Sequence, residues 1–322
     1  MSDNLIQSIH EASALRPAGM LVTPLTLSIA LSEALGCNVY LKCEHLQATG
    51  SFKYRGAANK IRVLDDASRA RGVVTASSGN HGQALALAGR VAGVRVTVYV
   101  ASIASPAKMA AIKAYGAELI VLDIDPLQVE LFARAEAERS GRTFVSPYND
   151  LDVIAGQGTM GVELLEQLPE VDAVFVAVGG GGLASGLGTA LKAARPEIQL
   201  IGCWPEVAQS LKRNLEEGRI CDVAEGETIS DGTAGNVEPG SVTFDICARV
   251  LDERIAVSEK EIKRAMRDVA EAEHWIVEGA AGVAMAGASA MAGQYSGRSI
   301  AVIVCGRNVG FARFLDSVET AA

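Results

Sequence analysis

Lys53 is the side chain of this sequence best suited to covalent chemistry. It lies in the segment GSFKYRG, which begins at Gly50 and follows the apolar run NVYLKCE from Asn38, a predicted β-strand. A lysine amine can form a Schiff base with a carbonyl, or take a proton, once its surroundings lower its pKa. Taken alone, the position is more typical of a solvated lysine at a helix start, since most lysines are exposed. The interpretation of Lys53 therefore depends on the loops around it.

Two further loops each follow a predicted strand and open a predicted helix. The first is SSGNHGQ, from Ser77, and the second is GGGGLASG, from Gly179. Free N–H groups at a helix start suit a carboxylate or a phosphate, and small residues let a ligand approach the backbone. The first loop is also compatible with an ordinary N-cap turn, because Ser and Asn are common caps. Four consecutive glycines are entropically costly, so packing alone is a weak explanation for the second loop.

A fourth segment, VCGRN from Val304, follows the apolar run SIAVIV and can present a small polar side chain to a ligand. It is also compatible with a plain strand-end turn. The glycine loop supports one rival interpretation, since a second strand, IQLIGC, follows it and ends near Glu206, as in a dinucleotide-binding unit. Its spacing, G-x-G-x-x-x-G, differs from the usual dinucleotide fingerprint, so this second signal is weak.

The elements that must position these loops are short apolar runs alternating with alanine-rich helical patterns. The predicted strands are NVYLKCE from Asn38, GVVTAS from Gly72, VRVTVYV from Val94, ELIVLD from Glu118, TFVSPY from Thr143, AVFVAV from Ala173, IQLIGC from Ile198 and SIAVIVCG from Ser299. The clearest helical patterns begin at Gly82 and Glu259. This alternation predicts an α/β protein with mainly parallel sheets covered by helices on both faces.

Composition excludes several classes of function. The net charge of −9 leaves no basic surplus for nucleic acid, and no run of lysines and arginines suggests a membrane surface. Residues 173–191 carry no charge, but glycines interrupt them, so they predict a strand, a loop and a helix start and not a membrane span. The six cysteines form no C-x-x-C pair, so we expect reduced thiols and no metal site. The polar N-terminus lacks the apolar core of a signal peptide, and we expect a cytoplasmic protein.

Taken together, the segments SFKYRGA, SSGNHGQ, IAGQGT and GGGGLASG, in this order, resemble the serine/threonine dehydratase family of fold type II, tryptophan synthase β-like pyridoxal-phosphate enzymes. DGTAG from Asp231, VEGAAG from Val277 and CGRN extend the resemblance over most of the chain. It implies two open parallel-sheet domains, a large one of residues 1–71 plus 149–322 and a small inserted one of residues 72–148 that closes over substrate. It also implies a homodimer or other homo-oligomer.

The resemblance implies a set of cofactor-binding residues. They are Phe52, Lys53, Asn80, Gly179, Gly180, Gly181, Gly182, Leu183 and Cys305. In relatives, the equivalent of Lys53 holds pyridoxal 5'-phosphate as a Schiff base and the glycine loop cradles the phosphate. Asn80 is implied to bond the phenolic oxygen, Phe52 to pack on the ring and Cys305 to face the ring nitrogen.

The implied substrate is a small β-hydroxy amino acid. The substrate-binding residues by resemblance are Ser77, Ser78, Gly79, Asn80 and His81, whose amides receive the carboxylate; Lys53 and Ser78 are the implied catalytic residues. The freed Lys53 would take the Cα proton, the β-hydroxyl would leave, and hydrolysis would give a 2-oxo acid and ammonia. We therefore expect L-threonine and L-serine to yield 2-oxobutyrate and pyruvate.

Two departures from the family pattern leave alternatives open. The usual glycine pair near the C-terminus is Gly306-Arg307 here, and the arginine could select an acidic side chain or point outward. Metal-dependent relatives carry acids after the strand equivalent to IQLIGC, whereas only Glu206 is found there, so we expect no metal. The alternatives of the same fold are a 3-hydroxyaspartate dehydratase, a serine racemase and an ectoine-pathway dehydratase. An NAD-binding oxidoreductase and a non-catalytic amino-acid-binding protein are more remote.

Overall fold

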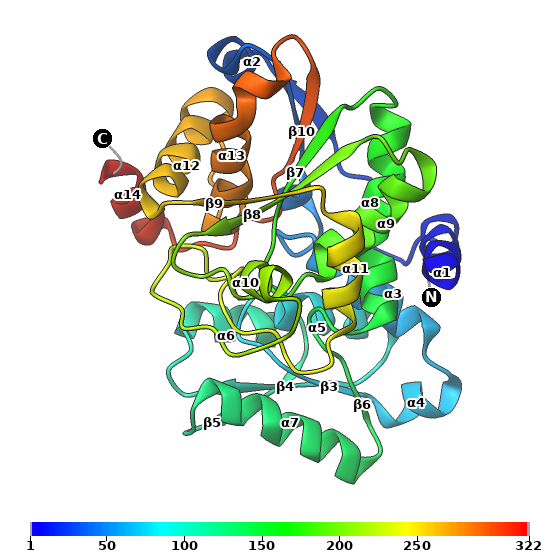
Figure 1. Ribbon diagram of the computed structural model, residues 1–322. Helices are drawn as coiled ribbons and strands as arrows, with labels where there is room; N and C mark the ends of the chain where they lie inside the picture. The colour runs from blue at the N-terminus through cyan, green and yellow to red at the C-terminus, as the bar shows by residue number, and fades with distance from the viewer. Residues whose placement is uncertain (1, 321–322) are drawn as a thin grey trace.

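The computed structural model describes residues 2–320 and contains two sheets, each covered by helices (Figure 1). The larger sheet has the strand order β1-β2-β10-β7-β8-β9. Its strands are β1 (Leu25–Ser28), β2 (Asn38–Lys42), β7 (Ala173–Ala177), β8 (Gln199–Pro205), β9 (Glu253–Val257) and β10 (Ser299–Ile303). All neighbouring strands run parallel except β1, which pairs antiparallel with β2. The antiparallel strand β1 is thus an edge strand of an otherwise parallel sheet.

The smaller sheet is wholly parallel and has the order β5-β4-β3-β6. Its strands are β3 (Val73–Ala76), β4 (Val96–Ala101), β5 (Glu118–Leu122) and β6 (Thr143–Phe144). Strands such as β4 and β7 are buried along their whole length, which explains why they are continuous apolar runs and do not alternate. The α/β class and the parallel sheets predicted from sequence are confirmed.

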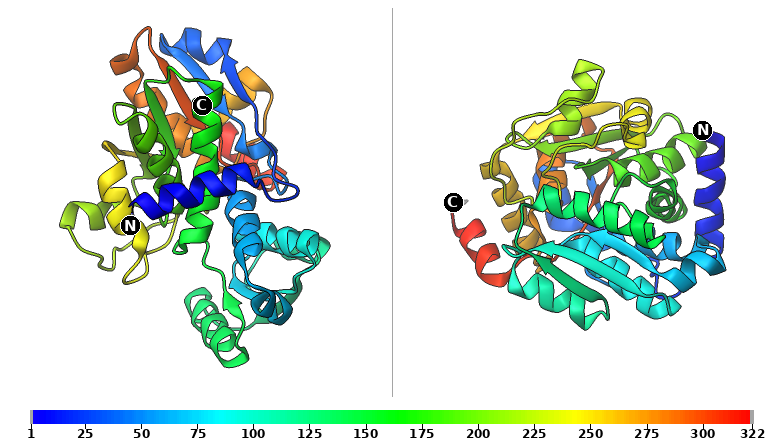
Figure 2. Two further views of the ribbon diagram at one scale, coloured as in Figure 1. Left: turned by 90° about the vertical axis from the view of Figure 1, so that its right-hand side faces the viewer. Right: turned by 90° about the horizontal axis from the view of Figure 1, so that it is seen from below.

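The α-helices cover both faces of each sheet. They are α1 (Ser2–Ala14), α2 (Ile29–Leu35), α3 (Lys53–Val63), α4 (Asp66–Arg71), α5 (Asn80–Ala92), α6 (Pro106–Ala114), α7 (Pro126–Ser140), α8 (Leu151–Gln167), α9 (Gly182–Ala194), α10 (Ser210–Glu217), α11 (Val242–Val250), α12 (Glu259–Glu273), α13 (Gly279–Met291) and α14 (Phe311–Glu319), with short 3-10 turns at Glu44–Leu46 and Ala292–Tyr295. Helix α13 packs on one face of the large sheet and α8 and α9 lie on the other, with α1 crossing α8 (Figures 1 and 2). None of these helices is long and apolar enough to cross a membrane.

Helix α3, which begins at Lys53, lies between the two sheets, because it packs on α8, which covers the larger sheet, and on α5, which follows β3 of the smaller sheet. A buried ion network fixes this helix. Arg55 makes two-pronged contacts of 2.7 to 2.8 Å with Glu44 and Glu163, and Lys42 Nζ lies 2.9 Å from Glu163. Two cations and two carboxylates balance in charge, so burial leaves no net charge unpaired. The residue that begins α3 is therefore held rigidly.

Candidate active site

Three neighbouring strands of the large sheet lead into the predicted site loops. Strands β2, β10 and β7 are adjacent, and their carboxyl ends lead to Lys53, Cys305 and the glycine loop respectively. In open α/β sheets the carboxyl ends of the strands are where ligands bind. The fourth loop, Ser77 to Gly79, follows β3 at the middle of the smaller sheet and opens α5. Four segments that are far apart in the sequence thus border one region between the sheets.

Lys53 lies partly buried at the start of α3. Its Nζ donates a 2.8 Å hydrogen bond to the carbonyl oxygen of Pro147 and lies 5.2 Å from the centre of the Phe52 ring. Burial lowers the pKa of Lys53 to about 8, although Cys305 and Glu278 oppose the shift. At pH 8 about half of such a group is free amine, against about 0.3% of an ordinary lysine. Lys53 therefore supplies a nucleophilic amine near neutral pH.

The Lys53 segment is tied directly to the end of β10. The Phe52 N–H donates to the Cys305 carbonyl at 3.0 Å, and the Arg307 N–H donates to the Gly50 carbonyl at 2.9 Å. Burial raises the pKa of the Cys305 thiol well above its ordinary value. A thiol with such a pKa is neutral at physiological pH, so Cys305 offers an uncharged hydrogen-bonding group beside Lys53.

The glycine loop presents a row of unused backbone donors. The amides of Gly179 to Ala184 donate no hydrogen bond to any group within residues 2–320, whereas the next amide, that of Ser185, donates to the Gly181 carbonyl. Gly181 caps α9 with φ 87°, a left-handed conformation that favours glycine. Unpaired donors at a buried helix start need a partner, and an anion of phosphate size satisfies several at once.

Packing also requires glycine throughout this loop. A Cβ at Gly180 would lie 2.5 Å from the Tyr148 ring, and a Cβ at Gly182 would lie 2.9 Å from Tyr148 Cα. At Gly179 and Gly181 it would meet other atoms at 2.9 and 2.8 Å. A neighbour closes each of the four positions to a side chain, so packing contributes to the choice of glycine more than the sequence suggested. The unused amides, and not the absence of side chains, are what indicate an anion here.

The loop from Ser77 also offers free donors. Within the described chain, the amides of Ser78, Asn80, His81 and Gly82 donate to no protein group, while the Gly79 amide donates to Ser77 Oγ at 3.3 Å. The His81 ring is buried, its Nε2 bonds the Val145 carbonyl at 3.1 Å, and burial lowers its pKa to about 3. His81 is therefore neutral, and its amide, not its ring, is available to a carboxylate.

Sequence reasoning missed a carboxylate at this site. Glu278 precedes α13 and is buried, with Oε1 and Oε2 lying 2.9 and 3.1 Å from Asn80 Nδ2. The Asn308 N–H donates to Glu278 Oε2 at 3.0 Å, and Asn308 Nδ2 donates to Asn80 Oδ1 at 2.7 Å. Both residues lie in segments recognised in the sequence, VEGAAG and CGRN, but only the fold brings them to Asn80. Tyr148 was missed for the same reason.

Two residues with open roles are also located. Ser78 is half-buried in its loop, and its hydroxyl makes no hydrogen bond to the described residues. Arg307 is exposed, and the charge it carries helps to lower the pKa of the buried His45, after burial itself. Within the part of the chain that the structure describes, no cluster of three or more His, Cys, Asp or Glu side chains could hold a metal ion.

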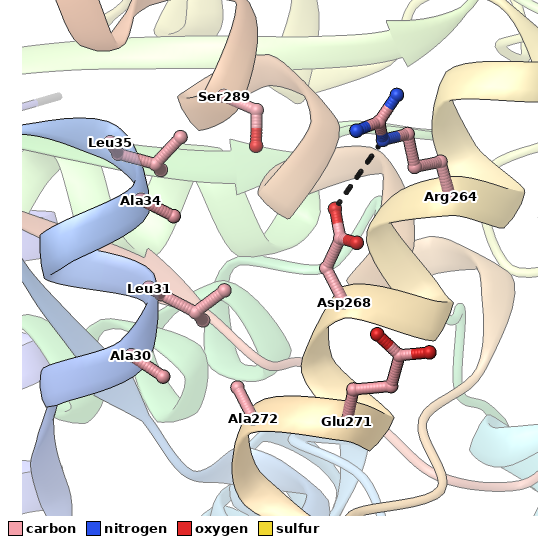
Figure 3. Close-up of a pocket in the computed structure, with 9 residues that line it drawn as sticks. All are labelled: Ala30, Leu31, Ala34, Leu35, Arg264, Asp268, Glu271, Ala272 and Ser289. Carbon is pink, nitrogen blue, oxygen red and sulfur yellow. Dashed lines mark ion pairs between the residues drawn. The ribbon is translucent and has the colours of Figure 1, made fainter.

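A separate hollow of about 530 Å³ lies between α2, α12 and α13, away from the site (Figure 3). Apolar residues of α2 line one wall, and the charged side chains of α12 line the other. Asp268 pairs with Arg264 at 4.0 Å, Glu271 pairs with Arg267, and Ser289 Oγ donates to the Met285 carbonyl. The polar groups of this hollow are thus engaged, and none of the predicted site residues reaches it.

Comparisons with known proteins identify the family. Residues 18–306 match the family model described as "Pyridoxal-phosphate dependent enzyme". The L-threonine dehydratase catabolic TdcB of Staphylococcus aureus is 38% identical over 317 residues, which cover 97% of this chain and 91% of that protein. The processed form of threonine deaminase isoform 2 from Solanum lycopersicum superposes with a TM-score of 0.94 at 33% identity, covering 100% of this chain and 94% of that one. Serine racemase from Dictyostelium discoideum has a TM-score of 0.89 at 36% identity, with 95% and 99% covered.

Proposed function

The chain belongs to the family of pyridoxal-phosphate-dependent enzymes, and from that premise we propose that it is a serine/threonine dehydratase. The reaction is β-elimination, which converts L-threonine to 2-oxobutyrate and L-serine to pyruvate, with release of ammonia. The observation that supports it most is the position of the Lys53 amine. It bonds the carbonyl next to Tyr148, whose ring packs on Gly180, and its charge acts on His81. Most amides of the two loops donate to no group among the described residues. One loop suits the phosphate of the cofactor and the other suits the carboxylate of an amino acid.

The residues present fit the cofactor. The free amides from Gly179 to Leu183 would hold the phosphate, Lys53 would hold the aldehyde carbon covalently, and Asn80 would bond the phenolic oxygen. Phe52 would pack against the ring, and Cys305 would face its nitrogen. When bound, the cofactor supplies an electron sink that acidifies the substrate Cα–H.

The chain's own groups then carry the proton. The Lys53 amine would take the Cα proton of the substrate, for which its lowered pKa suits it. The Pro147 carbonyl, 2.8 Å from Nζ, holds the amine in place within the site. A neutral Cys305 thiol would give the ring nitrogen no negative partner, and elimination would then be favoured over transamination.

The substrate carboxylate would bind the amides of Ser78, Asn80 and His81. Arg307 is the candidate that the sequence offers as a clamp for a second carboxylate, but its side chain is exposed. We therefore favour L-serine and L-threonine over 3-hydroxyaspartate.

The test compares release of pyruvate, 2-oxobutyrate and oxaloacetate from L-serine, L-threonine and 3-hydroxyaspartate as kcat/KM. The proposal predicts that serine or threonine is preferred, and that Arg307→Ala leaves this preference unchanged. A preference for the diacid by more than about tenfold, about 1.4 kcal/mol of transition-state stabilisation, would refute it. A selective loss of diacid activity in Arg307→Ala would then identify Arg307 as its clamp.

A second activity, serine racemisation, is favoured by Ser78. Its half-buried hydroxyl has no partner among the described residues and lies in the loop proposed for the carboxylate, where a second proton donor would be needed. Chiral analysis of L-serine during turnover tests this, with Ser78→Ala as the variant. Formation of D-serine that Ser78→Ala abolishes, while pyruvate release persists, would add racemase activity.

We further propose a homodimer or other homo-oligomer located in the cytoplasm. All six cysteines are free thiols, as expected for a reducing compartment. Light scattering of the purified protein measures the oligomer directly.

A further inference from the structure

Glu278 is a buried carboxylate that the proposed reaction does not use. It is 8% exposed and forms no ion pair with any described residue. Burial raises its pKa, while the hydrogen bonds from Asn80 and Asn308 oppose the shift. A buried carboxylate without a cation is costly, so the position of Glu278 calls for an explanation.

Capping of its own helix does not explain it. Glu278 occupies the N-cap of α13, yet its side chain makes no capping hydrogen bond. The carboxylate is turned away from the helix start and toward Asn80 and Asn308. We therefore attribute the position of this carboxylate to its hydrogen bonds with Asn80 and Asn308 and not to helix capping.

The backbone is shaped to admit this carboxylate. A Cβ at Gly306 would lie 2.6 to 2.8 Å from the Glu278 carboxylate atoms, so a side chain after Cys305 would displace the carboxylate from this position. The Glu278 N–H donates to the Gly306 carbonyl at 3.1 Å, which fixes the two segments together. The carboxylate is therefore held beside Gly306, the residue that follows Cys305.

The contacts determine how the Asn80 amide is turned. Its oxygen accepts from Asn308 Nδ2, which is itself anchored on the Thr49 carbonyl at 2.9 Å. Its nitrogen faces the two Glu278 oxygens, which can only accept. If the amide were reversed, its NH2 group would face the Asn308 NH2 group and its oxygen would face the Glu278 carboxylate, so that donors and acceptors would be mismatched on both sides. An amide nitrogen carries two hydrogens, so one can bond Glu278 and leave the other for a ligand.

We propose that Glu278 is a positioning residue that locks the Asn80 amide with its N–H toward the phenolic oxygen of the cofactor. The inference rests on the proposed function, because Asn80 is assigned to that oxygen only there. Asn308 is the second part of the lock, since it holds the other end of the same amide.

The test replaces Glu278 by glutamine and follows the bound cofactor, not only turnover. Glu278→Gln keeps the shape, but its NH2 group must replace one of the two acceptor oxygens, and in either orientation it then opposes the Asn80 Nδ2 donor. We expect the dissociation constant for pyridoxal phosphate, titrated into apoenzyme, to rise about tenfold, the effect of losing one hydrogen bond to a charged group. The absorbance maximum of the bound cofactor, and the pH at which that absorbance changes, should also shift.

Matched variants separate positioning from a general loss of structure. Glu278→Asp retains the charge and should restore part of the wild-type spectrum. Glu225→Gln is the control, because Glu225 accepts only from the Ser210 and Gly235 amides, outside the site, and its spectrum should be unchanged. If Glu278→Gln does not fold, Asn308→Ala removes the other half of the lock and should shift the spectrum in the same direction.

The outcomes distinguish the inference from the proposed function. Wild-type protein that binds no pyridoxal phosphate would overturn both. Wild-type protein that binds it, with Glu278→Gln or Asn308→Ala indistinguishable from Glu225→Gln in spectrum and affinity, would overturn the positioning role alone.

Discussion

Gly180→Ala should weaken the anion loop through one identified contact. The new Cβ would lie 2.5, 2.6 and 2.7 Å from Tyr148 Cγ, Cδ1 and Cδ2. Cγ is the root of the ring, so the ring cannot swing clear without moving the Tyr148 backbone, and its hydroxyl is held by the Glu238 amide at 3.0 Å. Gly180 does not have a positive φ, so backbone strain does not contribute.

Overpacking of this kind costs about 1 to 3 kcal/mol. If the loop stays in place, this cost appears as a lower free energy of unfolding of the apoenzyme. If the loop shifts instead, the cost appears as a weaker affinity for pyridoxal phosphate, by about 5- to 150-fold. Urea denaturation of the apoenzyme and cofactor titration measure the two parts, and their sum should fall in the stated range.

Two further variants make the reasoning refutable. Gly293→Ala is the control, because a Cβ there meets no atom within 4 Å, and neither measurement should change. In a Tyr148→Ala background, Gly180→Ala should lose most of its cost, since the clashing ring is gone. An equal cost in both backgrounds, or no cost in either, would show that the Tyr148 contact does not shape the loop.

Three other predictions concern Lys53, the ion network and metal. Burial lowers the pKa of Lys53 to about 8. The rate at which apoenzyme attaches pyridoxal phosphate should therefore rise between about pH 7 and 9, as the amine loses its proton, and then level off. A rate that still rises near pH 10, where an ordinary lysine titrates, would contradict the burial of this amine. Glu163→Gln leaves Lys42 and Arg55 with a single carboxylate, and urea denaturation should show a loss of about 3 to 5 kcal/mol, whereas a loss below 1 kcal/mol would mean that the network relaxes. Activity should survive EDTA, since only Glu206 follows β8 where metal-dependent relatives have acids; loss that magnesium or calcium restores would reveal a site that the sequence did not predict.

The central strands could be predicted from sequence because strands buried on both faces must be apolar. Strands β1 and β9 were missed for the converse reason. They lie at the two edges of the large sheet, and Leu25–Ser28 and Glu253–Val257 are only partly buried, so polar residues interrupt their pattern. An apolar run marks a central strand, but an edge strand is specified mainly by the neighbour with which it pairs.

The loops of the candidate site that offer backbone amides could be predicted from the sequence. The side chains that reach the site from distant segments could not. The loops from Ser77 and Gly179 are recognisable because each is a run of small residues between a predicted strand and a predicted helix. Glu278 acts on Asn80 from 198 residues away, and neither local spacing nor composition connects them. Tyr148, which closes the glycine loop, is likewise assigned only by the packing of the folded chain.

The most direct test of the account is to locate the covalent attachment of the cofactor. Wild-type protein loaded with pyridoxal phosphate should absorb at roughly 410–420 nm, as expected for a covalently held cofactor. Borohydride reduction, proteolysis and mass spectrometry should then find the pyridoxyl group on Lys53, and Lys53→Ala should give neither the adduct nor turnover. An adduct on another lysine, or normal turnover by Lys53→Ala, would contradict the assignment on which the proposed function depends.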